Sequence, residues 1–281
     1  MNCFFVSDLH GRINRYESLF ARIREDKPDG VFLGGDLFPP FGGSVQGDFL
    51  DDFLAAGFIR LQEVLDENYP RVFLILGNDD RKTDQDDLLR LENEKGIWEY
   101  IHNRDVSFGE YKVFGYNYVP PTPFLNKDWE RYDVSRFVDP GCIPPEEGWH
   151  SIEEPMNLIE HATIKADLEQ LTDGKDLSKS IFLFHTPPYQ TALDRAALDG
   201  KMVDHVPLDV HVGSIAVKDF IQERQPMITL HGHVHESAGI TGNWMEQLGR
   251  TTAISAAHGG QELALVRFTP NDPGTAVRDL I

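Results

Sequence analysis

The chain has 281 residues, of which 41% are hydrophobic and 26% are charged, as in an ordinary soluble globular protein with a sizeable core. Its net charge of −20 repels polyanions, so long nucleic acid is a poor default substrate. Cys3 and Cys142 make no disulfide framework, and no apolar stretch reaches the roughly 18 residues of a membrane span. We therefore expect one cytoplasmic domain over residues 1–281, with no membrane segment.

Apolar stretches and helix-spaced apolar stripes alternate from the start of the chain. Tyr16, Leu19 and Ile23, for example, recur at the spacing that places side chains on one face of a helix. The predicted elements are, in order, a strand at 3–6, a helix at 12–26, a strand at 31–33, a helix at 48–66, a strand at 72–76, a helix at 84–95 and a strand at 111–115.

Residues 116–148 interrupt this alternation. The segment is rich in proline and has no periodic pattern, and a loop of this length in a compact domain is usually functional or disordered. Its aromatic content argues against disorder. We expect an insert that forms a rim or lid over the functional site and sets substrate size. Its flat apolar side chains either face a base or a ring of the substrate, or pack on the core below and only anchor the loop. These side chains are Phe124, Trp129, Tyr132 and Phe137.

The alternation resumes after the insert. The predicted elements are a helix at 155–171, a strand at 181–184, a helix at 214–224, a strand at 227–230, and two closing antiparallel strands at 251–256 and 263–268. The whole order predicts an α/β fold with an antiparallel C-terminal sheet.

Polar residues follow five of the predicted strands directly. Ligands of α/β proteins bind beyond the carboxyl ends of parallel strands, so we expect these residues to converge on one edge of one sheet. Carboxylate, amide and imidazole groups together suit Mn, Fe, Zn or Co. Singly, each block is more typical of a turn or a helix cap, but five in a row predict a two-metal site. The blocks are Asp8-Leu9-His10, Gly35-Asp36, Gly77-Asn78, His185 and Gly232-His233-Val234-His235.

In order and type, these blocks resemble the metallophosphoesterase (calcineurin-like phosphoesterase) superfamily over about residues 1–268. The resemblance implies a four-layer α/β/β/α sandwich of two mixed sheets, and two divalent ions per chain, Mn, Fe, Zn, Co or Ni. It also implies attack on a small phosphoester by a hydroxide that bridges the ions. The implied ligands are Asp8, His10 and His235 for one ion, Asn78, His185 and His233 for the other, and Asp36 as a bridge.

Position 79 departs from the family pattern, since many members have histidine after the Gly-Asn pair and this chain has Asp79. A carboxylate repels phosphate, so Asp79 cannot simply replace an imidazolium that contacts phosphate or protonates the leaving group. Arg81 and His258 are candidates for the missing positive charge, although a helix-start arginine and a turn histidine are the plainer interpretations. His231 is interpreted as a structural residue or a support for the ligands.

Two classes of function remain open. The first is an enzyme, a dinuclear metal-dependent phosphoesterase acting on a small phosphodiester or phosphomonoester. The second is a non-catalytic binding module that keeps the fold. The intact set of seven ligands favours the enzyme, since binding alone needs no bridging aspartate. A nuclease is disfavoured by the acidic charge and by the dispersed lysines and arginines.

Overall fold

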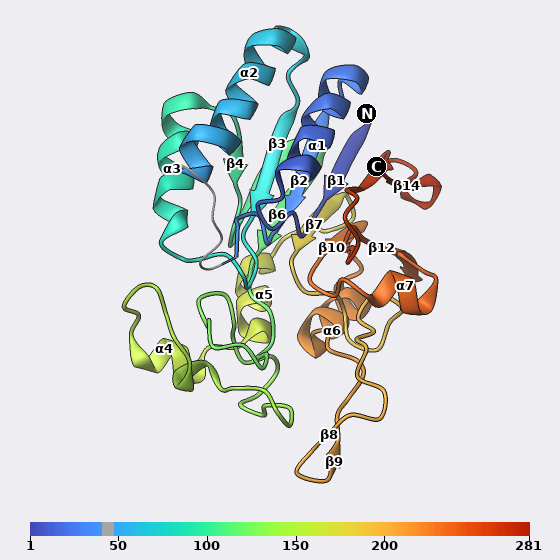
Figure 1. Cartoon of the computed structure of the whole chain (residues 1–281). Coiled ribbons are helices and arrows are strands. Elements are labelled where there is room, and N and C mark those ends of the chain that lie inside the picture. Colours follow the sequence, from blue (N-terminus) through green and yellow to red (C-terminus); the bar gives the residue numbers. More distant parts are fainter. Residues whose placement is uncertain (41–47) are drawn as a thin grey trace.

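The computed structural model describes residues 1–40 and 48–281. Two six-stranded β-sheets form the centre, and helices cover their outer faces (Figure 1). The expected α/β architecture with two mixed sheets is confirmed. Within the described residues, no helix is both long enough and apolar enough to cross a membrane.

The first sheet has the strand order β14-β13-β1-β2-β3-β4. Strands β1 to β4 run parallel, whereas β13 pairs antiparallel with β1 and with β14. The bounds are β1 Cys3–Val6, β2 Gly30–Gly34, β3 Arg71–Ile75, β4 Glu99–Tyr100, β13 Ala264–Phe268 and β14 Val277–Leu280.

The second sheet has the order β11-β12-β10-β7-β6-β5, with four parallel strands between two antiparallel edge strands. The bounds are β5 Arg104–Phe108, β6 Tyr111–Tyr116, β7 Ser180–Phe184, β10 Ile228–His231, β11 Met245–Leu248 and β12 Thr251–Ser255. A separate short hairpin pairs β8 (Met202–Val203) with β9 (Val206–Pro207).

The prediction of two closing antiparallel strands is wrong in part. β13 is antiparallel to β1, but β12 lies in the other sheet, where it runs antiparallel to the edge strand β11 and parallel to β10. Every residue of β12 is buried, so its apolar run carries no information on strand direction.

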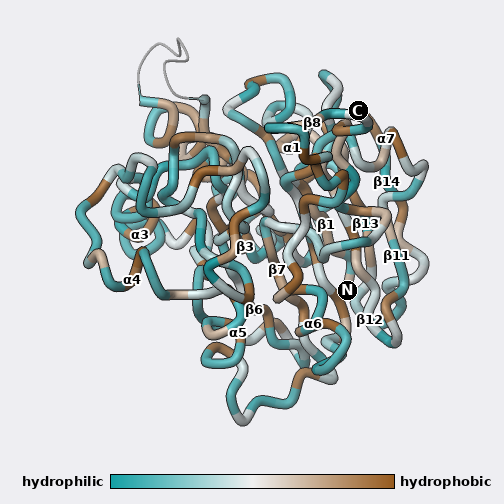
Figure 2. Tube along the Cα trace, turned by 90° about the horizontal axis from the view of Figure 1, so that it is seen from below, coloured by the Kyte–Doolittle hydropathy of each residue, from teal (hydrophilic) through white to brown (hydrophobic). Residues whose placement is uncertain are grey.

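Alternation of side chains along the strands builds two apolar layers. In β1, Cys3 and Phe5 point into the core between the sheets, where Phe5 clusters with Phe32 and Phe73. Phe4 and Val6 point the other way, into the core beneath the helices. Because both faces are covered, the strand is apolar throughout. Figure 2 shows the hydrophobic segments gathered along the central strands, with hydrophilic segments at the periphery.

Helices α1 (Ile13–Asp26), α2 (Ala56–Leu65) and α3 (Asp84–Lys95) lie beside β1 to β4, and α5 (Ile164–Thr172) and α6 (Ile215–Arg224) lie beside β6, β7 and β10 (Figure 1). A π-helical segment, Phe49–Ala55, leads into α2. The shorter helices are α4 Met156–His161, α7 Ser237–Thr241 and the 3₁₀ turns Asp66–Asn68, Pro145–Glu147 and Pro273–Thr275.

The single helix predicted over 155–171 is wrong, since α4 and α5 replace it. Ala162 between them is extended, with ψ 143°. Thr163 begins α5 as its N-cap, because its side chain accepts a hydrogen bond from the Ala166 N–H. The cap competes with continuation of the helix through Ala162.

Candidate metal centre

The five polar blocks converge in space, but from two sheets. Strands β1, β2 and β3 of the first sheet lead to the loops of Asp8, Asp36 and Asn78, while β7 and β10 of the second lead to His185 and His233. The expectation of one edge of one sheet is therefore wrong. Strands buried on both faces look alike in sequence, so the apolar runs do not reveal which strands pair.

The loops that carry these residues have an unusual backbone. Asp8, His10, Asp36 and His233 have positive φ angles of 57°, 47°, 52° and 73°. Such angles are uncommon for residues other than glycine and cluster at functional sites. Hydrogen bonds between the loops hold them in place, from the Asp8 N–H to the Gly35 carbonyl at 3.0 Å and from the His10 N–H to the Asp36 carbonyl at 2.8 Å.

A first group of donor atoms forms around His235. Its Nε2 lies 3.2 Å from Asp8 Oδ1 and 3.1 Å from His10 Nε2. Donor atoms of Asp8, His10, Asp36 and His235 all lie within 4.8 Å of one another. Donors bound to one divalent ion at about 2.0–2.2 Å are separated by about 3 Å, so this spacing fits a shared ion.

A second group forms around His185. Its Nε2 lies 3.1 Å from Asn78 Oδ1 and 3.2 Å from Asp36 Oδ2. The ring of His233 stands 5.3 Å from the ring of His185 at an interplanar angle of 64°. On its other side, His185 Nδ1 donates a hydrogen bond to the Gly34 carbonyl at 2.8 Å, which leaves Nε2 to face the oxygens.

Asp36 lies between the two groups. Its Oδ2 is 3.2 Å from His185 Nε2 and 3.8 Å from His10 Nε2. Its Oδ1 accepts a hydrogen bond from the Asp79 N–H at 2.9 Å, which fixes the orientation of the carboxylate. The Asp36 carboxylate thus faces one histidine of each group.

The ionisable groups are strongly coupled. Burial alone would raise the pKa of Asp36, but the His185 and His10 imidazoles outweigh it and lower the pKa to about 2. Burial alone would lower the pKa of His185, but Asp36 and Asp8 raise it to about 10. The buried carboxylates thus favour a positive charge at His185. Burial and the neighbouring His185 lower the pKa of His233 to about 3, so its imidazole stays neutral.

Two further observations fit a divalent cation, and a third shows how closely the groups approach one another. Asp8 Oδ2 is fully buried and has no hydrogen-bond partner among the residues that the structure describes, which is costly for a carboxylate oxygen unless a cation is present. His185 Nε2 faces two oxygen acceptors, and such a group of electron-rich atoms needs a proton or a metal ion among them. A Cβ added at Gly77 would lie 2.3 Å from Asp36 Oδ1 and 2.6 Å from His185 Nε2, so this close approach requires glycine.

Asp80 supports the centre, although its sequence context does not distinguish it from an ordinary turn residue. Its buried carboxylate accepts hydrogen bonds from the N–H groups of Leu37, Phe38 and Gly77 at 2.9 Å each. It therefore ties the loop after β2 to the loop after β3. Burial and the nearby Asp36 raise the pKa of Asp80, while these N–H donors oppose the shift.

Arg15 is a second support that the sequence did not reveal. This buried side chain on α1 donates to the backbone carbonyl of Asp8 and, at 2.7 Å and 3.1 Å, to those of Gly260 and His258. It joins the Asp8 loop to the glycine-rich turn after β12. The helical spacing of the apolar residues places Arg15 next to the buried Tyr16, but it does not predict the distant carbonyl groups to which Arg15 donates.

The three candidate catalytic residues, Asp79, Arg81 and His258, differ in whether they line the cavity beside the centre. Asp79 borders the centre, with Oδ2 3.5 Å from His10 Nδ1. Arg81 makes an ion pair with Asp84 at 3.4 Å at the start of α3. His258 lies 3.3 Å from Glu262 through its Nε2. Of the three, only Asp79 lines the cavity beside the centre.

His231 has the structural role expected of it. Its ring nitrogens lie 2.9 Å from the Thr186 carbonyl and 2.8 Å from Thr229 Oγ1, and its ring stacks on Phe184. Burial lowers the pKa of His231 to about 4. Both ring nitrogens are thus engaged within the protein.

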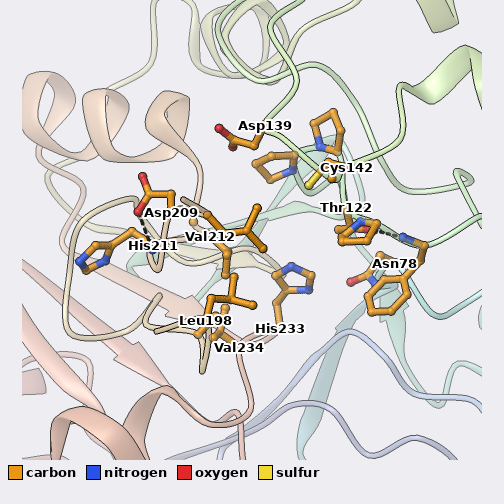
Figure 3. A pocket seen from close by; sticks show the side chains of 18 of the residues that line it. Asn78, Thr122, Asp139, Cys142, Leu198, Asp209, His211, Val212, His233 and Val234 are labelled. Atoms are coloured by element: carbon orange, nitrogen blue, oxygen red, sulfur yellow. Dashed lines mark hydrogen bonds between the residues drawn. The ribbon is translucent and has the colours of Figure 1, made fainter. Parts of the chain in front are cut away.

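The insert at 116–148 borders this cavity, as the rim hypothesis requires. Its cavity-lining residues include Pro120, Thr122 and Phe124, and Figure 3 shows Thr122 beside Asn78. The aromatic side chains divide into two sets. Phe124 and Phe137 are exposed, but Trp129 and Tyr132 are only 1% and 2% exposed. Of the two roles open to these aromatics, Trp129 and Tyr132 therefore pack in the core and anchor the insert, and they offer no surface to a ligand.

A buried ion pair anchors the insert. Lys127 and Glu130 are both fully buried and joined through Lys127 Nζ and Glu130 Oε2. Glu130 also accepts hydrogen bonds from the backbone N–H and the hydroxyl of Thr122, which lines the cavity. The two charges stand three residues apart in a segment without helical pattern, so their pairing has no signal in the sequence.

Comparisons with known proteins identify the family of the chain. A crystal structure of TT1561 of Thermus thermophilus is 16% identical, with a TM-score of 0.60 over 99% of this chain and 98% of that one. A dimetal phosphatase from Danio rerio is 11% identical, with a TM-score of 0.49 over 95% and 91% of the two chains. No curated protein matches the chain. The family model of the calcineurin-like phosphoesterases matches residues 1–237, and the chain belongs to this family.

Proposed function

We propose that the chain is a dinuclear metal-dependent phosphoesterase that hydrolyses a small phosphodiester or phosphomonoester. The observation that carries the proposal is the position of Asp36, whose Oδ2 lies between His10 Nε2 at 3.8 Å and His185 Nε2 at 3.2 Å. In the proposed assignment, Asp8, His10 and His235 hold one ion, Asn78, His185 and His233 hold the other, and Asp36 bridges. Two divalent ions bound there would supply Lewis acidity and a water of lowered pKa.

The surrounding residues orient these ligands before substrate arrives. The Gly34 carbonyl fixes the tautomer of His185, and the Asp79 N–H fixes Asp36. The His233 N–H donates to Asp8 Oδ1 at 2.9 Å and so sets the rotamer of that carboxylate. Such pre-organisation removes a reorganisation cost from the reaction.

Asp79 shapes the choice of substrate. Its carboxylate stands beside His10 and lines the cavity, where many family members have a histidine. A negative charge there opposes a dianionic monoester more than a monoanionic diester. It also offers no imidazolium to protonate a leaving group. We therefore favour diesters with good leaving groups, such as bis(p-nitrophenyl) phosphate.

Metal analysis followed by a phosphoester panel with Mn, Ni, Co, Zn and Fe tests the proposal. Wild-type protein should bind two ions per chain and hydrolyse at least one diester. The Asp36→Asn variant should stay folded but bind at least one ion fewer and no longer hydrolyse the ester. The reason is that an amide bridges two cations far more weakly than a carboxylate does. Asp199→Asn, at an exposed position, is the matched control.

Two outcomes would count against the proposal. Two bound ions with near wild-type turnover in Asp36→Asn would contradict the bridging role. Two bound ions in the wild type without turnover of any ester would favour the non-catalytic binding module.

A further inference from the structure

A cavity of about 560 Å³ opens directly beside the metal-binding residues. Asp36, Asn78, His233 and His235 form part of its lining. In Figure 3, His233 stands between Asn78 and the apolar side chains of Leu198 and Val234. Cavities of roughly 300–1,000 Å³ hold whole organic ligands, so this one has room for much more than a phosphate group.

The two long walls of the cavity are apolar and come from separate segments. The insert supplies one wall, with Pro120, Pro121, Pro123, Phe124 and Pro140. The chain between β7 and α6 supplies the other, with Ala196, Leu198, Val203, Leu208 and Val212. The walls meet at Gly141, where an added Cβ would lie 3.1 Å from Val203 Cγ2 and 3.9 Å from Leu208 Cδ2.

The permanently charged side chains around the cavity have one sign. Its histidines are engaged elsewhere, since His233 and His235 belong to the proposed metal centre and His211 Nδ1 lies 2.8 Å from Asp194 Oδ1. Among its described lining residues there is no lysine and no arginine, whereas Asp79, Asp139, Asp209 and Glu236 contribute carboxylates. A second anionic group on a ligand would enter without a cationic partner and near these carboxylates. Both the lack of a cationic partner and the repulsion from these carboxylates disfavour binding of a ligand with a second anionic group.

We infer that this cavity receives the organic ester group of the substrate and selects an uncharged, apolar one. The inference rests on the proposed function, which places the phosphorus atom at the metal-binding residues. The preferred substrate is then a phosphodiester of an apolar alcohol, and nucleotides with further phosphates and sugar phosphates are disfavoured. Water attacks phosphorus, the bond to the leaving oxygen breaks, and the apolar monoester is released with the second alcohol.

Alkyl p-nitrophenyl phosphates with methyl, butyl, hexyl and 5-carboxypentyl groups test this specificity. All four release the same p-nitrophenolate, so differences in kcat/KM report the fit of the alkyl group. Burial of each methylene group should raise kcat/KM roughly fourfold until the cavity is filled. The carboxylate-ended chain should react at least about tenfold more slowly than the hexyl ester, since its charge is unpaired.

A charge placed in the wall should reverse the preference. Leu208→Lys puts an ammonium group beside Val203, and Leu208 is half-buried, so a long side chain can be accommodated. The ratio of hexyl to carboxypentyl turnover should fall to about one or below. Leu158→Lys adds the same charge at an exposed position of α4 outside the cavity lining and should keep the wild-type ratio.

Binding of non-cleavable phosphonates separates this inference from the proposed function. In calorimetry, hexylphosphonate should bind more tightly than both methylphosphonate and 6-phosphonohexanoate. In the Leu208→Lys variant, the affinities for hexylphosphonate and 6-phosphonohexanoate should become similar. Turnover with no dependence on chain length or terminal charge would overturn the inference and leave the phosphoesterase intact. Absence of turnover with the expected binding order would overturn the phosphoesterase and leave the apolar cavity supported.

Discussion

The side-chain amide of Asn126 donates a hydrogen bond of 2.9 Å to the backbone carbonyl of Asn78. Asn126 belongs to the insert, and Asn78 belongs to the loop after β3 that carries a proposed metal ligand. Asp128, two residues further on, accepts hydrogen bonds from the backbone N–H groups of Lys82 and Ser151. The insert is thus attached at more than one point to the loop that carries this proposed ligand.

Asn126→Ala should weaken metal binding without unfolding the protein. Loss of the amide frees the Asn78 backbone, and loss of such outer contacts typically costs about tenfold or more in metal affinity. Titration of the metal-free protein with Mn²⁺ measures the change. Asn93→Ala, which removes a similar 2.8 Å hydrogen bond to the Leu89 carbonyl on α3, is the control. Equal Mn²⁺ affinity in both variants would show that the hydrogen bond from the insert does not support metal binding.

Trp129→Ala should destabilise the fold rather than alter substrate binding. Trp129 is 1% exposed and packs against Tyr118 and His102 at ring distances of 5.4 Å and 5.0 Å. Its removal should lower the free energy of unfolding by about 3–5 kcal/mol in urea. Phe124→Ala, at a position 58% exposed, should change it by less than about 1 kcal/mol. Similar values for both variants would place Trp129 outside the core.

His102 should make the fold sensitive to acid. Burial, with Lys82 and Arg131 nearby, lowers the pKa of His102 from 6.5 to about 3, and its Nδ1 accepts the Asn117 N–H at 3.1 Å. A lowered folded pKa means that the stabilisation is complete above pH 6.5 and is lost as the pH falls from 6.5 toward 3. A protonated Nδ1 cannot accept that hydrogen bond.

The free energy of unfolding should fall by about 1 kcal/mol for each pH unit below the pKa of His102 in the unfolded chain. Urea unfolding of the metal-free protein at pH 7 and pH 5 measures it. His102→Asn keeps an acceptor near the same place and should reduce the difference between the two pH values. His161→Asn, at a side chain 61% exposed, should leave the difference unchanged. An unchanged difference in His102→Asn would show that other groups carry the acid sensitivity.

The strands before the proposed ligands were predicted well from the sequence, because apolar runs bounded by Gly-Asp, Gly-Asn or Asp-x-His are local signals. β1 coincides with the predicted 3–6, and α3 with the predicted 84–95. The division of these strands between two sheets came only from the family resemblance. Strand pairing depends on contacts between distant residues, and fully buried strands have no alternation to mark a face.

The supports of the centre were harder to predict. Asp80, Arg15 and Asn126 act through backbone groups of other loops, and a backbone partner leaves no mark on the sequence. The environment of Trp129 stayed open at the level of the sequence, because an aromatic residue in a loop fits both a binding surface and a buried anchor. Only the contacts of the folded insert distinguish these two roles.

Asp79→His should change the response to the leaving group. An imidazole beside the centre could protonate a poor leaving oxygen, and general acid catalysis is worth roughly 10²–10⁴-fold. The ratio of kcat/KM for bis(p-nitrophenyl) phosphate to that for methyl phenyl phosphate should therefore fall in the variant. Asp79→Asn removes the negative charge without adding an acid and serves as the control. Equal gains on both esters in Asp79→His would exclude an acid role for this position.

The central claim, that Asp36 bridges two metal ions, is tested most directly by diffraction from crystals grown with Mn²⁺ and measured at the manganese absorption edge. We expect two anomalous peaks on either side of the Asp36 carboxylate. One should lie among Asp8, His10 and His235, and the other among Asn78, His185 and His233. A single peak, or peaks away from Asp36, would contradict the claim.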